Sequence, residues 1–119
     1  TNMGLLQTVV FGAPGGRMLG LQVDGTGTAS IDTGGPNASL TDNGTGDYTI
    51  TFDRPFARTP VPVVTPISTS STVGHTVESV SKSAVRVKTF TVASSTATAA
   101  DLKFNMIVMG WDSADERLR

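Results

Sequence analysis

The 119-residue chain contains no cysteine, so its fold uses neither disulfides nor thiolate metal ligands. It also has no uninterrupted run of about 18 apolar residues, and the sequence therefore predicts no membrane-spanning helix. No basic region followed by a long apolar stretch stands near Thr1, so no signal peptide is expected. The net charge is −1, which gives no electrostatic footprint for nucleic acid or anionic lipid.

Charged residues make up only 16% of the chain, and Thr and Ser take their place on the expected solvent faces. This substitution suits β-strands, which tolerate Thr better than Glu or Lys. The length predicts one domain. We expect an N-terminal arm or first strand over residues 1–12, a β-sandwich domain over 13–111 and a polar tail over 112–119. Thr1 is interpreted as following a removed initiator methionine, so a complete short protein is expected.

The clearest local pattern is a turn followed by a strand. Residues 43–47, Asn-Gly-Thr-Gly-Asp, supply turn chemistry. Tyr48, Ile50 and Phe52 then alternate with threonines, which is the period of a half-buried strand. Most of the chain repeats this pattern of short strands separated by turn residues. About eight short strands are expected, at residues 5–12, 18–23, 28–32, 48–53, 60–67, 76–81, 84–92 and 102–111, with a brief pairing at 39–41. Their spacing predicts an antiparallel sandwich or barrel.

Several local features refine this prediction. Phe56 follows a strand-breaking Arg-Pro pair and is expected to turn back into the core as a plug. The strand over 60–67 carries three prolines, which cannot donate to a ladder, so it is expected at an edge or paired on one side only. A parity switch near Lys88 and Thr89 suggests a β-bulge. Residues 94–100 are small and are interpreted as a loop.

Candidate reaction chemistry is sparse. The Gly-rich segment 12–17 lacks the Gly-Lys-Ser/Thr of a phosphate-binding loop and predicts a turn. His75 is the only histidine, and one histidine without cysteine does not build a zinc site. Asp42-Asn43-Gly44 has some likeness to a calcium loop but lacks its spacing and terminal Glu, which favours a turn. Glu78 and Glu116 are the only glutamates, and they make a poor acid–base pair for glycoside hydrolysis.

The last strand is anomalous because it is apolar on both faces. Phe104, Met106 and Val108 lie on one face of the expected strand. Ile107, Met109 and Trp111 lie on the other. Either this strand is covered by the protein's own loops, or its outer face packs on another subunit. For the second case the expected oligomer-interface residues are Phe90, Met106, Met109 and Trp111.

The segment 45–52, Thr-Gly-Asp-Tyr-Thr-Ile-Thr-Phe, is followed by Phe56, by the Pro-Val-Pro-Val-Val run at 60–64 and by the closing strand 104–110, Phe-Asn-Met-Ile-Val-Met-Gly. Over residues 45–111 the chain resembles β-sandwich modules of tailed-bacteriophage virions, in particular capsid decoration (cement) proteins. The resemblance implies a small jelly-roll-like sandwich, commonly a homotrimer, that binds the outer surface of the expanded capsid and stabilises it. It offers no catalytic residue and no cofactor.

These observations lead to the expectation of a non-enzymatic structural virion protein, made in the host cytoplasm and bound to the major capsid protein. It is expected to bind no metal, cofactor, nucleic acid or membrane. The residues expected to reach the capsid lie in the two terminal segments: Met3, Leu5, Leu6, Val9, Phe11, Arg117 and Arg119.

Two alternatives come from other functional classes. A receptor- or glycan-binding tail-fibre tip would expose Trp111, Tyr48 or His75 to a sugar. A small hydrolase would use His75 as its base.

Overall fold

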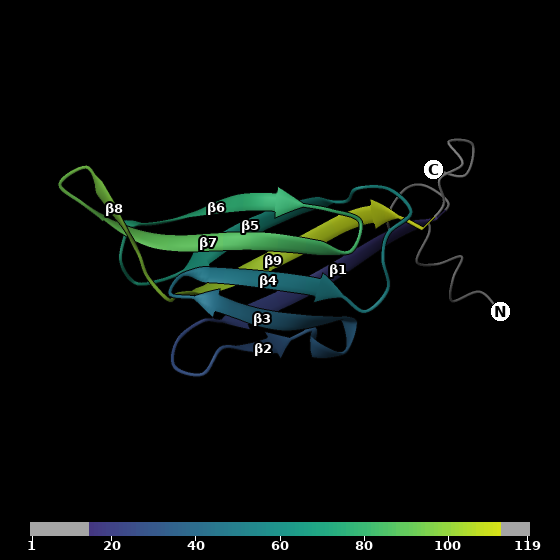
Figure 1. Ribbon diagram of the computed structural model, residues 1–119, viewed down its shortest axis with the longest axis horizontal. Helices are drawn as coiled ribbons and strands as arrows, with labels where there is room; N and C mark the ends of the chain where they lie inside the picture. Colours follow the sequence, from purple (N-terminus) through teal and green to yellow (C-terminus); the bar gives the residue numbers. More distant parts are fainter. Residues whose placement is uncertain (1–14, 113–119) are drawn as a thin grey trace.

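Two antiparallel sheets pack face to face in the computed structural model, which describes residues 15–112 (Figure 1). One, here called the β1–β9 sheet, has the order β2-β1-β9-β5, and the other, the β4–β7 sheet, has the order β3-β4-β7-β6 with β8 paired to β7. The strands are β1 (Gly16–Asp24), β2 (Ser30–Thr33), β3 (Ala38–Gly44), β4 (Asp47–Phe52), β5 (Val61–Ile67), β6 (Val73–Val80), β7 (Ala84–Ala93), β8 (Thr96–Ala99) and β9 (Lys103–Trp111), with a 3-10 turn η1 (Gly35–Asn37). The predicted all-β antiparallel sandwich is confirmed.

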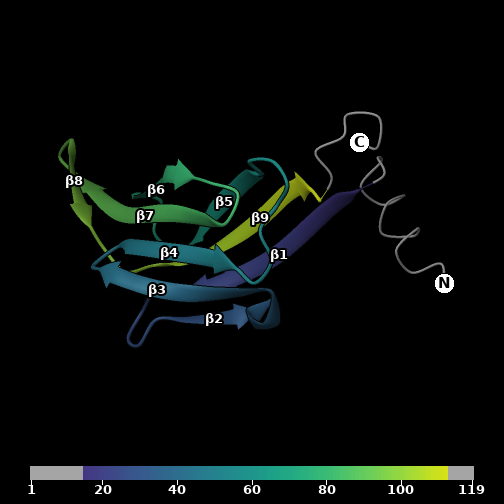
Figure 2. The same ribbon diagram turned by 45° about the vertical axis from the view of Figure 1, so that its right-hand side comes forward.

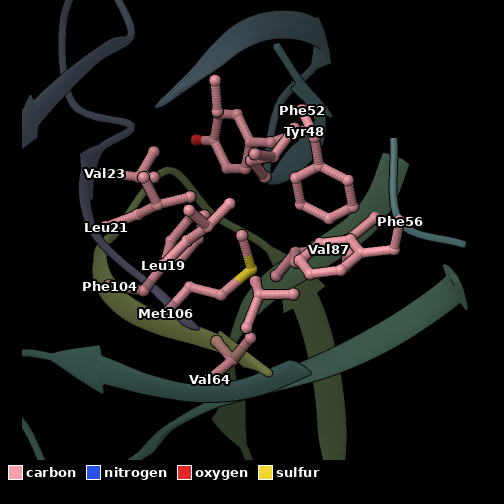
Figure 3. Packing of buried hydrophobic residues seen from close by; sticks show 14 residues of the cluster. Leu19, Leu21, Val23, Tyr48, Phe52, Phe56, Val64, Val87, Phe104 and Met106 are labelled. Carbon is pink, nitrogen blue, oxygen red and sulfur yellow. The ribbon is translucent and has the colours of Figure 1, made fainter. Parts of the chain in front are cut away.

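The core forms because alternate residues of each long strand point between the sheets. In β4 the expected triplet Tyr48, Ile50 and Phe52 is buried, as the alternation predicts. Figure 3 shows the Tyr48 and Phe52 side chains meeting those of β1 and β9 across the sandwich. The inward residues contributed by β1, β7 and β9 are Leu19, Leu21, Val23, Val85, Val87, Phe104, Met106 and Val108.

The first and last described strands are neighbours. β1 and β9 pair along their whole length, from Gly16 opposite Trp111 to Asp24 opposite Lys103. β9 pairs on its other side with β5, which leaves β5 at the edge of its sheet. Proline lacks the N–H that a second neighbour would need, so the edge position predicted for this strand is confirmed. β9 is thereby a central strand, enclosed between β1 and β5.

Phe56 closes one end of the core, as expected. Its side chain is 2% exposed and meets the Phe52 ring edge-on, with centroids 5.2 Å apart. A Cβ at Gly110 would overlap the Phe56 ring, so the glycine makes room for this plug. The Arg17 guanidinium covers the ring from outside, 3.9 Å from its centroid. The sequence predicted that Phe56 is buried, but it did not predict the contacts with Gly110 and Arg17, which belong to the β1–β9 sheet.

Two local predictions are wrong. Residues 96–99 form strand β8 rather than part of a loop, joined to β7 by the two-residue turn Ser94-Ser95 with φ of 50° and 68°. Both positive values fit a type I′ hairpin turn, which usually signals itself by Asn-Gly. Figure 2 shows this hairpin at the end of the sandwich opposite the start of β1.

The second error is the bulge expected at Lys88 and Thr89. β7 keeps one parity, with Thr89 only 1% exposed and inside, and Phe90 outside. The register shift lies in the neighbouring strand β6, between Val77 and Ser79. Thr89 tolerates burial because its hydroxyl donates to the Ala100 carbonyl at 2.6 Å. The prediction failed because Phe90 and Val92 are apolar, although they lie on the outward face of β7.

The expected arm 1–12 and the tail beyond Asp112 lie outside the described residues, as do all seven expected capsid contacts. Asp112 itself is described, and its backbone N–H donates to the Gly15 carbonyl at 2.7 Å. Within residues 15–112 no helix is long and apolar enough to cross a bilayer.

Candidate functional site

The four expected interface residues do not share one surface. Met106 is fully buried between the sheets and cannot contact a partner, which corrects that prediction. Phe90 lies on the outer face of the β4–β7 sheet, where its ring occupies the space beside Gly74. Met109 and Trp111 do share a surface, because both point away from the core on β9. The sequence identified the anomalous strand correctly but could not separate its inner parity from its outer one.

The outer face of the β1–β9 sheet is the most apolar surface in the described part of the chain. Six large hydrophobic residues are exposed among residues 15–112, and all but Val92 lie on this face: Met18, Val61, Val63, Ile67 and Ile107. The largest apolar patch of a soluble monomer typically measures about 300–600 Å² and often serves as an interaction site. Of the two alternatives for β9, coverage by the protein's own loops finds no support among the described residues, which leave Ile107 45% exposed.

Strand pairing arranges these side chains in rows across the sheet. Met18 of β1 and Val61 of β5 flank Met109. The next row along the strands places Ile107 between Gly20 and Val63, because successive outward residues are two apart. A third row is polar and consists of Gln22, Asn105 and Thr65, with the Gln22 Nε2 donating to the Asn105 Oδ1 at 3.1 Å.

Gly20 creates a hollow in the middle of this face. A Cβ built at Gly20 meets no atom within 4 Å, so the missing side chain leaves open space. A shallow depression of about 420 Å³ lies there, and its walls come from β1, β9, β5 and β2: Gly20, Leu21, Gln22, Thr33, Val63, Thr65, Asn105, Met106 and Ile107. The face is therefore not flat, since Met18 projects from β1 two residues before the hollow at Gly20.

In β1 and β9, charged groups lie near the two ends of the strands. At one end the Lys103 ammonium lies 3.8 Å from the Asp24 carboxylate. At the other, the Arg17 Nε donates to the Asp112 Oδ1 at 2.8 Å, and its NH2 group donates to the Arg54 carbonyl at 2.9 Å. The Arg54 guanidinium also reaches Asp112, at 3.2 Å. The apolar rows between these ends carry no ionisable side chain.

Tyr48, one of the residues expected to stack on a sugar, is fully buried, and that hypothesis is wrong for this residue. Its hydroxyl donates to the Asp101 Oδ1 at 2.7 Å, and the same oxygen accepts the Gly46 N–H at 2.8 Å. Burial, followed by the hydrogen bond to Asp101, raises the pKa of Tyr48 well above its ordinary value. The hydrogen bond from Tyr48 in turn lowers the pKa of Asp101. This pair fastens the segment before β9 to β4.

His75 lies within strand β6, opposite Thr89. Among residues 15–112 no carboxylate hydrogen-bonds its ring, whereas a histidine base normally needs such an orienting group. The same residues contain no group of three or more His, Asp or Glu side chains placed to hold a metal ion. Asp42 accepts the Gly44 N–H at 3.0 Å, which is the turn geometry expected for that segment.

Sequence reasoning missed Met18, Gly20, Val61 and Val63 as members of one face. A signal was present, because Met18 has the parity opposite to Leu19 and Leu21 in the same strand. The sequence does not reveal the strand pairing that places these residues beside Ile107 and Met109. Comparisons of the chain with models of protein families, with curated proteins and with solved structures return no match.

Proposed function

We propose that this chain is a structural protein of a virus particle, a cement that binds the outer surface of the capsid and stabilises it. The observation that carries the proposal is the apolar outer face of the β1–β9 sheet, with Met18, Val61, Val63 and Ile107 each about half exposed. Such a face is built for contact with another protein surface. The resemblance over residues 45–111 supplies the kind of assembly in which that contact is made.

The size of the face predicts that a cement of this kind would act in many linked copies. Complete burial of an aliphatic side chain contributes about 1.5–3 kcal/mol. Covering the exposed half of the four side chains named above therefore contributes about 4 kcal/mol in total. Association itself costs about 4–15 kcal/mol in lost translational and rotational freedom. A single copy would bind weakly through this face alone, whereas linked copies on a repeating shell gain from effective concentration.

The capsid-binding part of the proposal rests on the terminal segments, where Leu5, Leu6, Val9 and Phe11 supply apolar groups and Arg117 and Arg119 supply charge. The test is co-sedimentation of the purified protein with expanded capsids of its own virus that lack it. The full chain should bind saturably and raise the temperature at which the capsids break open. Deletion of residues 1–12 or of 113–119 should weaken binding, and the sandwich should melt as before.

If both deletion variants bind capsids as tightly as the full chain, the assignment of the contact to the termini is wrong. If the full chain binds no capsid but binds host-surface glycans, the tail-fibre alternative replaces the cement. His75→Ala serves as the matched control, because the cement function predicts no effect from it.

A further inference from the structure

We infer that the outer face of the β1–β9 sheet docks on the same face of a second copy, so that Met18 of each copy fills the hollow at Gly20 of the other. The inference starts from the surface used in the proposed function but rests on its own geometry. It requires no virus particle and can fail while the cement role stands. In the dimer this face is occupied by the second copy, so the capsid contact falls to the terminal segments named above.

The geometry follows from strand register. Met18 and Gly20 are successive outward residues of β1, so their rows lie about 7 Å apart along the strands. A two-fold axis that runs across the strands, midway between the two rows, exchanges the rows. It places the ridge at Met18 of one copy over the hollow at Gly20 of its partner, and the reverse contact forms at the same time. This is an isologous contact, in which one patch is complementary to itself.

The chemistry of the two rows suits this pairing. Methionine is unbranched and fills irregular gaps, and Gly20 lines one side of such a gap, the 420 Å³ depression that continues toward Gln22 and Asn105. A face that docks on its own copy must also avoid burying a charge that finds no opposite charge across the two-fold axis. The two apolar rows satisfy this condition, since they consist of Met18, Met109, Val61, Gly20, Ile107 and Val63.

The area of the face sets the strength of the contact. Three strands about 4.8 Å apart, over the seven residues of β5 at about 3.4 Å each, give a footprint of roughly 350 Å² per copy. A standard stable interface buries about 800 Å² per partner. The pair is therefore a reversible dimer, populated where the local concentration is high, as on a crowded shell. The resemblance implies a trimer, but a closed trimer needs two different complementary patches, and this single patch pairs only with itself.

Sedimentation velocity of the full chain, from micromolar to hundreds of micromolar concentration, measures this association. The mass should rise from 12.3 kDa toward twice that value. Gly20→Met fills the hollow and should weaken the dimer about tenfold or more. Because a Cβ at Gly20 meets nothing, the variant should melt no lower than the wild type. Ile107→Lys should abolish the dimer, and the matched control Val92→Lys, on β7, should leave it unchanged.

A swap variant tests the register. Met18→Gly alone removes the ridge and should weaken the dimer. The double variant Met18→Gly/Gly20→Met exchanges ridge and hollow in both copies, and the two-fold arrangement predicts that it restores association. A wild-type mass of one chain at every concentration, a trimeric mass, or a double variant weaker than both single variants would each overturn the inference. A monomer that is nevertheless abundant in virus particles would overturn it and leave the cement role standing.

Discussion

The hydrogen bond between Tyr48 and Asp101 predicts a large loss of stability when its acceptor alone is removed. In Asp101→Ala the Tyr48 hydroxyl stays buried but loses its acceptor at 2.7 Å, and the Gly25 carbonyl at 3.4 Å is a poor replacement. The Gly46 N–H loses the same oxygen. Stranding a buried donor costs about 1–3 kcal/mol, and a hydrogen bond to a charged group contributes about 1.5–3 kcal/mol. The expected loss of unfolding free energy is about 3 kcal/mol.

Tyr48→Phe removes the donor instead and leaves the partly exposed Asp101 with the Gly46 N–H and water. Its cost should be about 1 kcal/mol, the net value of a typical hydrogen bond. The double variant should cost about 1–2 kcal/mol less than the sum of the single variants, because the phenylalanine ring has no hydroxyl to leave without an acceptor. Urea unfolding at pH 7, followed by tryptophan fluorescence and far-ultraviolet circular dichroism, measures all four proteins. If Asp101→Ala stays within about 0.5 kcal/mol of the wild type, or the two changes are additive, the pair does not fasten the segment before β9.

Two further predictions concern stability. The hydrogen bonds from Arg86, first among the causes, lower the pKa of Asp47 from 3.8 to about 2, so its ion pair stabilises the folded state above about pH 4. That contribution should be lost as the pH falls from about 4 to about 2, and an Arg86→Met variant should show a shallower decline in unfolding free energy over this window. Gly110→Ala should cost about 1–3 kcal/mol by forcing a methyl group against Phe56, and Gly110→Ala/Phe56→Leu should recover part of it in the same urea assay; equal stability of Gly110→Ala and wild type would contradict the plug.

The sequence predicted the fold wherever a strand signals its own burial. Tyr48, Ile50 and Phe52 alternate with threonine, and this pattern alone predicts β4 as a strand with one buried face. β8 carries no such pattern, because all four of its residues are exposed and small, and its Ser94-Ser95 turn lacks the usual Asn-Gly signal. Local patterns therefore found the strands that bury side chains and missed the one that only extends an edge.

The candidate site depends on contacts between distant parts of the chain, which local patterns do not contain. The sequence shows that β9 is apolar on both faces. It does not show which face is buried, because each face carries a methionine, and only the register places Met106 inside and Met109 outside. Met18 and Val61 reach Met109 through pairings across 91 and 48 residues. The same holds for Tyr48 and Asp101, which are 53 residues apart.

The copy number of this chain in purified virus particles, relative to the major capsid protein, tests the cement proposal most directly. Quantitative mass spectrometry of intact particles provides it. The proposal predicts hundreds of copies, near-stoichiometric with the shell protein. A few to tens of copies would place the chain on the tail and favour the glycan-binding alternative, and its complete absence from particles would contradict a structural role in the virion.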